Sequence, residues 1–305
     1  MEVYSDLRQC SQSNFSGQMV EEQLNSLFIL VNPLSLFGDA AKPQLITGPS
    51  FLKCDIPPNK HCRMVSFIGP TGVGKSQTMR YICAPHTRKP SPSARGEEQS
   101  WTADLNCYYG VIPRDTNTAD DLHFLMIDSE GTGGTSAKLA LGAFHDKRRD
   151  FVEKYYPSLL YRFSDIICFV CKPVETKNEI VEEAVKYAVA AGTRSPKPHL
   201  LFIINKTSDT SLTFVDYDYK KDTENFKNSV GKYQWEKLTK YYENPFVYRL
   251  PLWTTAGELA YFHAINQLRT QIHVLVKQVH EKYPLQTREQ LFDSLNKCLQ
   301  DLGAE

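Results

Sequence analysis

The sequence has no excess of charge of either sign. Its 305 residues carry 35 Lys and Arg against 35 Asp and Glu, so the formal net charge at pH 7 is zero. A chain without net positive charge has no global attraction to polyanions, which argues against a histone-like role or a polybasic membrane-binding role. We therefore expect no nucleic acid among its partners.

Long hydrophobic runs and a secretory signal are also missing. The longest apolar stretches, 27–31 and 166–170, are far shorter than the ~20 residues that span a bilayer. The amino terminus has no basic flank followed by an apolar run, as a secretory signal requires. The eight cysteines follow no framework spacing, so we interpret them as free thiols in a reducing compartment. The sequence predicts a cytoplasmic protein, and a membrane anchor or stalk would have to lie beyond residue 305.

Signatures of several enzyme classes are absent. The sequence contains no HExxH pair and no GxSxG turn with plausible triad partners. Cys168 and Cys171 form a CxxC motif, but residues three apart on a strand point to opposite faces, and no second pair follows at zinc spacing. We interpret both cysteines as buried strand thiols.

Short apolar runs alternate with helix-period segments, which is typical of an α/β fold. Because both alternating sets of positions in most runs are apolar, we expect a mostly parallel central sheet flanked by helices on both faces. The runs are SLFILV, RMVSFIG, LNCYYGVI, LHFLMID, DIICFVC, HLLFIIN and FVYRL.

Helices and loops are predicted between these runs. Apolar spacing predicts helices over 179–191 and 262–279. A capping-box pattern, Thr-Arg-Glu-Gln, predicts a last helix from Thr287. The polar stretches 85–100 and 216–224 are expected to be loops. The stretch HDKRRD, residues 145–150, is interpreted as a solvated helix face.

One loop carries the strongest functional signal. It fits G-x-x-x-x-G-K-[ST], follows the run RMVSFIG and precedes a helical segment that opens with Gln77. Its residues are Gly69, Pro70, Thr71, Gly72, Val73, Gly74, Lys75 and Ser76. Glycines let backbone N–H groups turn inward as an anion nest, and the helix N-terminus adds its dipole. We expect the loop to hold nucleotide phosphates, with Lys75 bridging the outer ones and Ser76 coordinating Mg²⁺. The alternative is a glycine-rich turn with a chance lysine.

Two further positions extend this phosphate site. The run LHFLMID ends in Asp128, which opens a D-x-x-G motif with Gly131. In nucleotide-binding loops of this kind the carboxylate orders the magnesium shell and the glycine N–H meets a γ-phosphate. Thr102, in the stretch between the two motifs, is the candidate to close on magnesium, with Ser100 and Thr87 as second choices.

A base-reading site is predicted after the run HLLFIIN, which leads into Asn205, Lys206 and, three residues later, Asp209. A carboxylate that accepts both N1–H and the exocyclic amine of guanine discriminates against adenine. In the usual N-K-x-D pattern the aspartate comes one residue earlier. Either the loop bulges so that Asp209 reaches the base, or the Asn-Lys pair marks a different local solution. A strand that ends in a polar turn is the third possibility.

With these motifs in place, the sequence resembles the large GTPases of the dynamin superfamily, most closely the guanylate-binding protein and atlastin group. The resemblance covers nearly the whole chain through SLFILVNP, RMVSFIGPTGVGKS, LHFLMIDSEGTGG, YYPSLLYRFSDIICFVCKPVET and FVYRLP, in that order. It implies a P-loop NTPase fold, with an enlarged GTPase domain over 1–283 and a helical tail over 284–305 that could begin a stalk or middle domain.

The resemblance also implies an activity and partners. It implies magnesium-dependent hydrolysis of GTP to GDP and phosphate, with switch loops that couple nucleotide state to homodimerisation. It further implies work on membranes through regions outside this chain, and hence a cytoplasmic protein peripheral to membranes.

The chain departs from the family at three places. The family ends its base-reading strand in R-D, whereas Asn205 and Lys206 are closer to the Ras-like version. The group carries a P-loop arginine where this chain has Gly72, and Ras-like enzymes place a glutamine where it has Thr132. We therefore predict that Arg88, Arg95 or a partner subunit supplies a catalytic arginine.

Two other functions stay open. One is a nucleotide-gated interaction module that scarcely hydrolyses GTP. The other is a P-loop ATPase or phosphotransferase, which needs no guanine reader.

Overall fold

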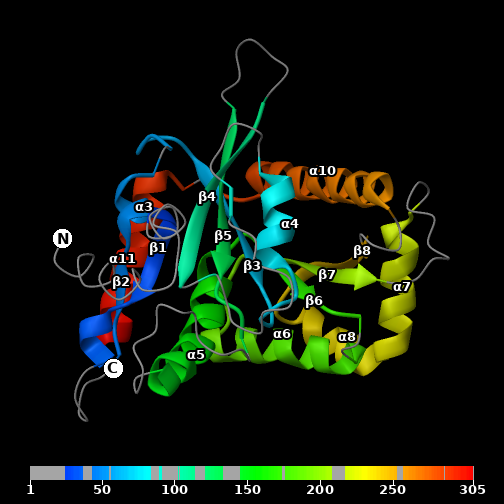
Figure 1. Cartoon of the computed structure of the whole chain (residues 1–305), viewed down its shortest axis with the longest axis horizontal. Coiled ribbons are helices and arrows are strands. Elements are labelled where there is room, and N and C mark those ends of the chain that lie inside the picture. The colour runs from blue at the N-terminus through cyan, green and yellow to red at the C-terminus, as the bar shows by residue number, and fades with distance from the viewer. Residues whose placement is uncertain are drawn as a thin grey trace.

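The computed structural model of the chain describes residues 25–36, 43–54, 56–83, 89–90, 102, 104–113, 121–132, 145–173, 176–207, 217–252, 257–284 and 286–304. Within these ranges eight strands form one sheet, and helices cover both of its faces (Figure 1). The predicted α/β class is therefore confirmed.

All seven apolar runs form strands, and one further strand was missed. The strands are β1 (Leu27–Val31), β2 (Leu45–Thr47), β3 (Cys62–Ile68), β4 (Leu105–Ile112), β5 (Leu122–Ser129), β6 (Ile166–Cys171), β7 (His199–Thr207) and β8 (Glu243–Pro251). The missed strand, β2, has only three residues, which is too short for an alternating pattern to be recognised.

The strand order is β2-β1-β4-β5-β3-β6-β7-β8. The predicted parallel arrangement holds from β5 to β8, where each strand is parallel to its neighbour. The other three pairings, β4 with β5, β1 with β4 and β1 with β2, are antiparallel, so the sheet is mixed. The reason at β4 and β5 is the short 113–121 connection, because a parallel crossover needs a dozen or more residues.

The helices lie in two layers. Buried residues of α4 (Lys75–Ile82) and α10 (Glu258–Lys282) form a core with one face of the sheet. Buried residues of α5 (His145–Phe163), α6 (Lys177–Ala191), α7 (Tyr219–Val230), α8 (Lys232–Thr239) and α11 (Arg288–Ala304) form a second core with the other face. A 3-10 turn, η1 (Pro33–Leu36), and a short helix, α3 (Pro49–Leu52), connect the first strands. No helix in the described ranges is long and apolar enough to cross a membrane.

Strand β6 shows why its sequence is apolar throughout. Cys168 belongs to the core beneath α4 and α10, and Cys171 to the core on the other face. Both are fully buried, and neither forms a disulfide. The interpretation of the CxxC motif as strand thiols on opposite faces is confirmed.

The predicted helix boundaries are largely correct. The α6 helix begins at a capping box formed by Thr176 and Glu179 and ends before Gly192. The α11 helix begins after Thr287, whose backbone and side chain exchange hydrogen bonds with Gln290. The helix predicted over 262–279 is longer than expected.

One interpretation of a polar stretch was wrong, and a second was correct only in part. Residues 219–224, expected as loop, open α7, because the Asp218 side chain accepts hydrogen bonds from the Lys220 and Lys221 N–H groups. The 145–150 stretch opens α5, but it is not wholly solvated, because Arg148 is buried.

The strand order marks one point of the sheet for ligand binding. The next two strands along the chain, β4 and β5, lie on one side of β3, and β6, β7 and β8 lie on its other side, so the strand order reverses at β3. In open α/β sheets, ligands bind outside the carboxyl ends of the strands at such a point. The 69–76 loop leaves β3 there and leads directly into α4.

Candidate functional site

Two glycines shape the 69–76 loop. Gly69 has φ of 136°, and a Cβ on it would lie 2.1 Å from the carbonyl oxygen of Val170 in β6. Gly74 has φ of 92°, and a Cβ there would lie 2.5 Å from Nδ2 of Asn205. Both positions need glycine for their backbone conformation and for the close approach of a neighbour.

Lys75 is held inside this loop. Its Nζ donates to the carbonyl oxygens of Gly69 and Pro70, both at 2.9 Å. Burial lowers the pKa of Lys75 to about 8, and the nearby carboxylates of Asp128, Glu130 and Glu183 act in the opposite direction. An anion bound in the loop would therefore stabilise the charged ammonium group.

The three predicted magnesium ligands meet beside the loop. Ser76 Oγ lies 2.8 Å from Thr102 Oγ1, which donates to Asp128 Oδ2 at 3.2 Å. The other carboxylate oxygen of Asp128, Oδ1, is buried without a hydrogen-bond partner. Burial raises the pKa of Asp128 to about 6, although the Ser76 hydroxyl, the Lys75 charge and the Thr102 hydroxyl oppose this shift.

This group of oxygens fits Mg²⁺ by its chemistry. Magnesium in nucleotide sites is bound through one or two carboxylates together with phosphate oxygens and waters, rather than by a cage of protein ligands. The described residues contain no group of three or more His, Cys, Asp or Glu side chains that could hold a metal alone. The single carboxylate with an unpartnered oxygen and the two hydroxyls match a magnesium site that phosphate oxygens and waters complete.

The segment after β5 crosses the first half of the loop. Thr71 N donates to Thr132 O at 2.9 Å, and Thr132 N donates to Gly69 O at 3.4 Å. Gly131 packs against the loop so closely that a Cβ on it would lie 2.4 Å from Thr71 Oγ1. The Thr71 N–H group, which the anion nest would direct at a phosphate, is thus bonded to the segment that carries Gly131.

The end of β7 contacts the loop from the other side. Asn205 Nδ2 donates to Val73 O at 2.7 Å, and Lys206 Nζ donates to Gly72 O at 3.2 Å. Lys206 has φ of 64°, and its N–H donates to Asn205 Oδ1 at 2.9 Å. Both side chains therefore fix the loop to β7.

The remaining predicted residues are not brought into this group. Gln77 lies on α4, and its Nε2 donates to the Tyr81 hydroxyl, one turn further along. Arg88, Arg95 and Asp209 lie outside the described residues, as do Thr87 and Ser100.

Sequence reasoning missed several side chains near the site. From α6, the Tyr187 hydroxyl donates to Glu183 and shares a hydrogen bond with Thr132. From α5, Arg148 reaches Glu130, the residue before Gly131. A signal for Arg148 was present, since Val152 and Tyr156 follow it at four-residue spacing and form one buried face.

Comparisons with known proteins add little to this geometry. No protein-family model matches the chain, and no curated protein matches it. Among solved structures, a crystal structure titled as a mutation variant of SsGBP matches with a TM-score of 0.38 and 12% sequence identity, over 77% of this chain and 61% of that chain. At this low similarity we infer nothing from the match.

Proposed function

We propose that this chain binds GTP with Mg²⁺ and hydrolyses it to GDP and phosphate. The observation that carries the proposal is the group formed by Ser76, Thr102 and Asp128 beside the buried Lys75. A carboxylate oxygen without a partner, two hydroxyls and a buried ammonium group form a donor set for a metal-bound polyphosphate.

Each group has a role in this proposal. The 69–76 loop and Lys75 hold the phosphates. Ser76, Thr102 and Asp128 would hold magnesium, which would neutralise charge that develops on the phosphate oxygens. The Gly131 N–H meets the γ-phosphate. Water attacks the γ-phosphate in line with the leaving oxygen, so the protein contributes mainly position and electrostatic stabilisation.

Guanine selectivity belongs to the end of β7. Asn205 and Lys206 hold the loop, and Asp209 follows three residues later in the sequence. We propose that Asp209 then accepts the N1–H and exocyclic amine of guanine.

We further propose that the chain is a large GTPase of the dynamin superfamily, similar to guanylate-binding proteins and atlastins. The support is the order of its motifs, and the fold would be that of the P-loop NTPases. Residues 1–283 would form the GTPase domain and 284–305 its helical tail. The protein would dimerise with nucleotide in the cytoplasm and reach membranes only through regions outside this chain.

Competition between GTP and ATP tests the assignment. We expect GTP to displace a fluorescent guanine nucleotide from the wild type far better than ATP does, and Asp209→Ala to reduce this preference. Equal affinities for GTP and ATP in the wild type would contradict guanine recognition and favour a P-loop ATPase or phosphotransferase.

A second candidate is a nucleotide-gated interaction module with little hydrolysis. It is favoured by two residues, since Gly72 and Thr132 stand where related GTPases have a catalytic arginine or glutamine. Phosphate release measured with and without an analogue that traps the dimer separates the two functions. No release under either condition would favour the module.

A further inference from the structure

A buried ionic cluster lies behind the candidate site, on the α5 side. Arg148 donates from Nη1 to Glu130 Oε1 at 2.8 Å and from Nη2 to Glu130 Oε2 at 2.6 Å. The same Nη2 donates to Asp104 Oδ1 at 2.8 Å. The three side chains are only 4% to 10% exposed. The guanidinium group of Arg148 therefore neutralises the carboxylates of Asp104 and Glu130, which would otherwise repel each other in a buried environment.

The two acidic residues are also joined through their backbones. Asp104 N donates to Glu130 Oε2 at 2.8 Å, and Glu130 N donates to Asp104 O at 2.9 Å. Asp104 has φ of 58°, which is unfavourable for a residue with a side chain. Its carboxylate also accepts from the Tyr156 hydroxyl at 2.5 Å and from Val31 N at 3.2 Å. These contacts hold Asp104 in a conformation that it would not adopt alone.

The cluster joins the two segments that carry the candidate ligands. Asp104 comes two residues after Thr102, and Glu130 lies between Asp128 and Gly131. Arg148 comes from α5, which packs on the sheet on the side away from α4. A change in the position of one segment must therefore be transmitted to the other or must break a buried ion pair.

We propose that Arg148 is a positioning residue that holds the Thr102 and Gly131 segments in the one arrangement that binds magnesium and the γ-phosphate together. The inference rests on the proposed function, because it concerns how that site discriminates a triphosphate from a diphosphate. The diphosphate would be held by the 69–76 loop and Lys75, which, among the described residues, the cluster reaches only through the segment after β5 and through the charge of Glu130.

The test measures, in the presence of magnesium, the ratio of the affinity for a non-hydrolysable GTP analogue to the affinity for GDP. Arg148→Lys keeps the charge but loses the paired hydrogen bonds to Glu130. We expect it to weaken binding of a non-hydrolysable GTP analogue roughly tenfold, as is usual for a coupling between two groups. Binding of GDP should change little. Titration calorimetry of both nucleotides on the full chain measures the ratio.

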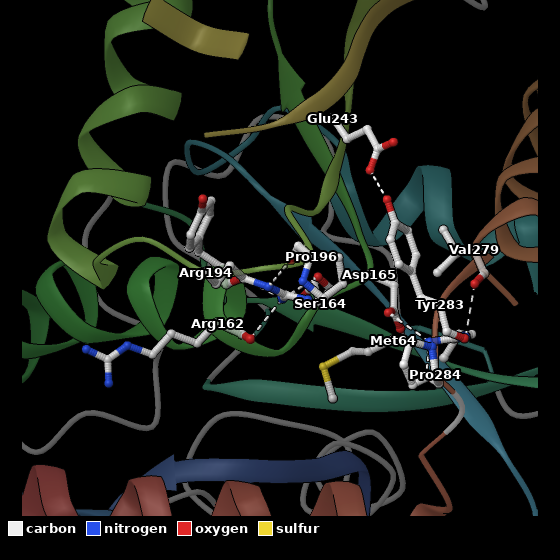
Figure 2. A network of polar contacts seen from close by, with 12 residues as sticks. Met64, Arg162, Ser164, Asp165, Arg194, Pro196, Glu243, Val279, Tyr283 and Pro284 are labelled. Atoms are coloured by element: carbon white, nitrogen blue, oxygen red, sulfur yellow. Dashed lines mark hydrogen bonds and ion pairs between the residues drawn. The ribbon is translucent and has the colours of Figure 1, made fainter. Parts of the chain in front are cut away.

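Arg63→Lys is the matched control. Arg63 forms a similarly buried ion pair with Asp165, with side chains 6% and 15% exposed. Figure 2 shows Asp165 and Tyr283 within the surrounding network of polar contacts. Arg63 lies at the start of β3, and its other hydrogen bonds go to backbone carbonyls at and just after the end of α10, those of Val279, Tyr283 and Pro284. We expect this variant to melt at a lower temperature with an unchanged ratio of affinities.

A second variant keeps the inference testable if Arg148→Lys does not fold. Tyr156→Phe removes one hydrogen bond to Asp104 and keeps the ring, so it should lower the ratio in the same direction by a smaller factor. A folded Arg148→Lys or Tyr156→Phe protein with the wild-type ratio, or with equal losses for both nucleotides, overturns the inference. A wild type that binds neither nucleotide refutes the proposed function instead.

Discussion

At the scale of the residue, Asp128 is placed where binding and folding make opposite demands. Its Oδ1 is buried without a partner, and burial raises its pKa to about 6. Because the pKa of Asp128 is higher in the folded state than in the unfolded state, its protonated form stabilises the fold at low pH. This contribution to the free energy of unfolding is lost as the pH rises through about 6. At pH 7 the ionised side chain therefore opposes folding, and a bound cation would remove this penalty.

We predict that Asp128→Asn separates these effects. At pH 7 the variant should be at least as stable as the wild type, with a gain of at most about 3 kcal/mol. Its affinity for a magnesium–GTP analogue complex should fall roughly 10- to 100-fold. Thermal unfolding and calorimetric titration measure the two effects. Asp121→Asn, just before the other end of β5, is the control that should change neither.

The ring of His273 predicts a second dependence on pH. It lies on α10 against the edge of Phe124, with ring centroids 5.9 Å apart. Burial, together with the charges of Arg269 and Lys277, lowers its pKa to about 4. The fold thus favours the neutral ring, so stability present above pH 6.5 is lost as the pH falls toward 4.

His273→Gln should therefore lose less stability than the wild type between pH 6.5 and pH 4.5. Denaturant unfolding at both values measures the difference between the two proteins, and unfolding at pH 7.5, where the ring is neutral in both states, provides the reference. A difference that is the same at all three pH values would mean that the substitution acts through packing and not through protonation.

At the scale of the element, α11 covers the part of the sheet that β1 and β2 form. The Phe292 ring stacks on Phe51, with centroids 4.2 Å apart, and meets the edge of Phe28 at 5.7 Å. These rings belong to the core that β1 shares with α5 and α6. The last helix therefore contributes to the stability of the same core as the sheet.

We predict that Phe292→Ala destabilises the whole chain by about 3 kcal/mol, because it leaves a cavity among aromatic rings. Lys297→Ala, on the exposed face of the same helix, should have almost no effect. Denaturant unfolding followed by circular dichroism measures both. If the unfolding curve instead showed an early transition that removes only a small part of the helical circular dichroism signal, α11 would unfold independently of the sheet.

The elements also show what the sequence could predict. Buried strands such as β6 and β7 were evident because both of their faces are apolar. The α6 helix was evident from its apolar spacing, and α11 from the capping box at its start. The α7 helix was hidden because its first turn is charged, while the residues that anchor it, Phe226 and Val230, come later. Local patterns therefore predict an element only where its own residues carry the signal.

The same distinction applies to the site. The 69–76 loop is a continuous motif, so Lys75 and Ser76 could be assigned a role from the sequence. The Arg148 contacts could not, because Asp104 and Glu130 are 44 and 18 residues away along the chain. Such a cluster exists only once β4, β5 and α5 are packed together.

At the scale of the whole molecule, the candidate site draws on opposite sides of the sheet. The loop after β3 is fixed by β7 through Asn205 and by the segment after β5 through Thr132. The segment after β5 is in turn fixed by α5 through Arg148. A change in the segment after β5 can therefore reach α5 as well as the loop. Under the proposed function, these contacts would connect the nucleotide to an outer helix.

The proposed homodimer makes a prediction about the whole molecule that also concerns the catalytic arginine. If Arg88 or Arg95 acts across a dimer, turnover per subunit should rise with protein concentration, and Arg88→Ala or Arg95→Ala should lower it by about 10³-fold. Arg149→Ala is a matched control, because this half-buried arginine pairs only weakly with acidic neighbours on α5. Steady-state phosphate release over a range of concentrations, with sedimentation velocity in a transition-state analogue, measures both effects. Constant turnover with monomers throughout, together with normal rates in both variants, would contradict the dimer and leave a hydrolysis that each subunit performs alone.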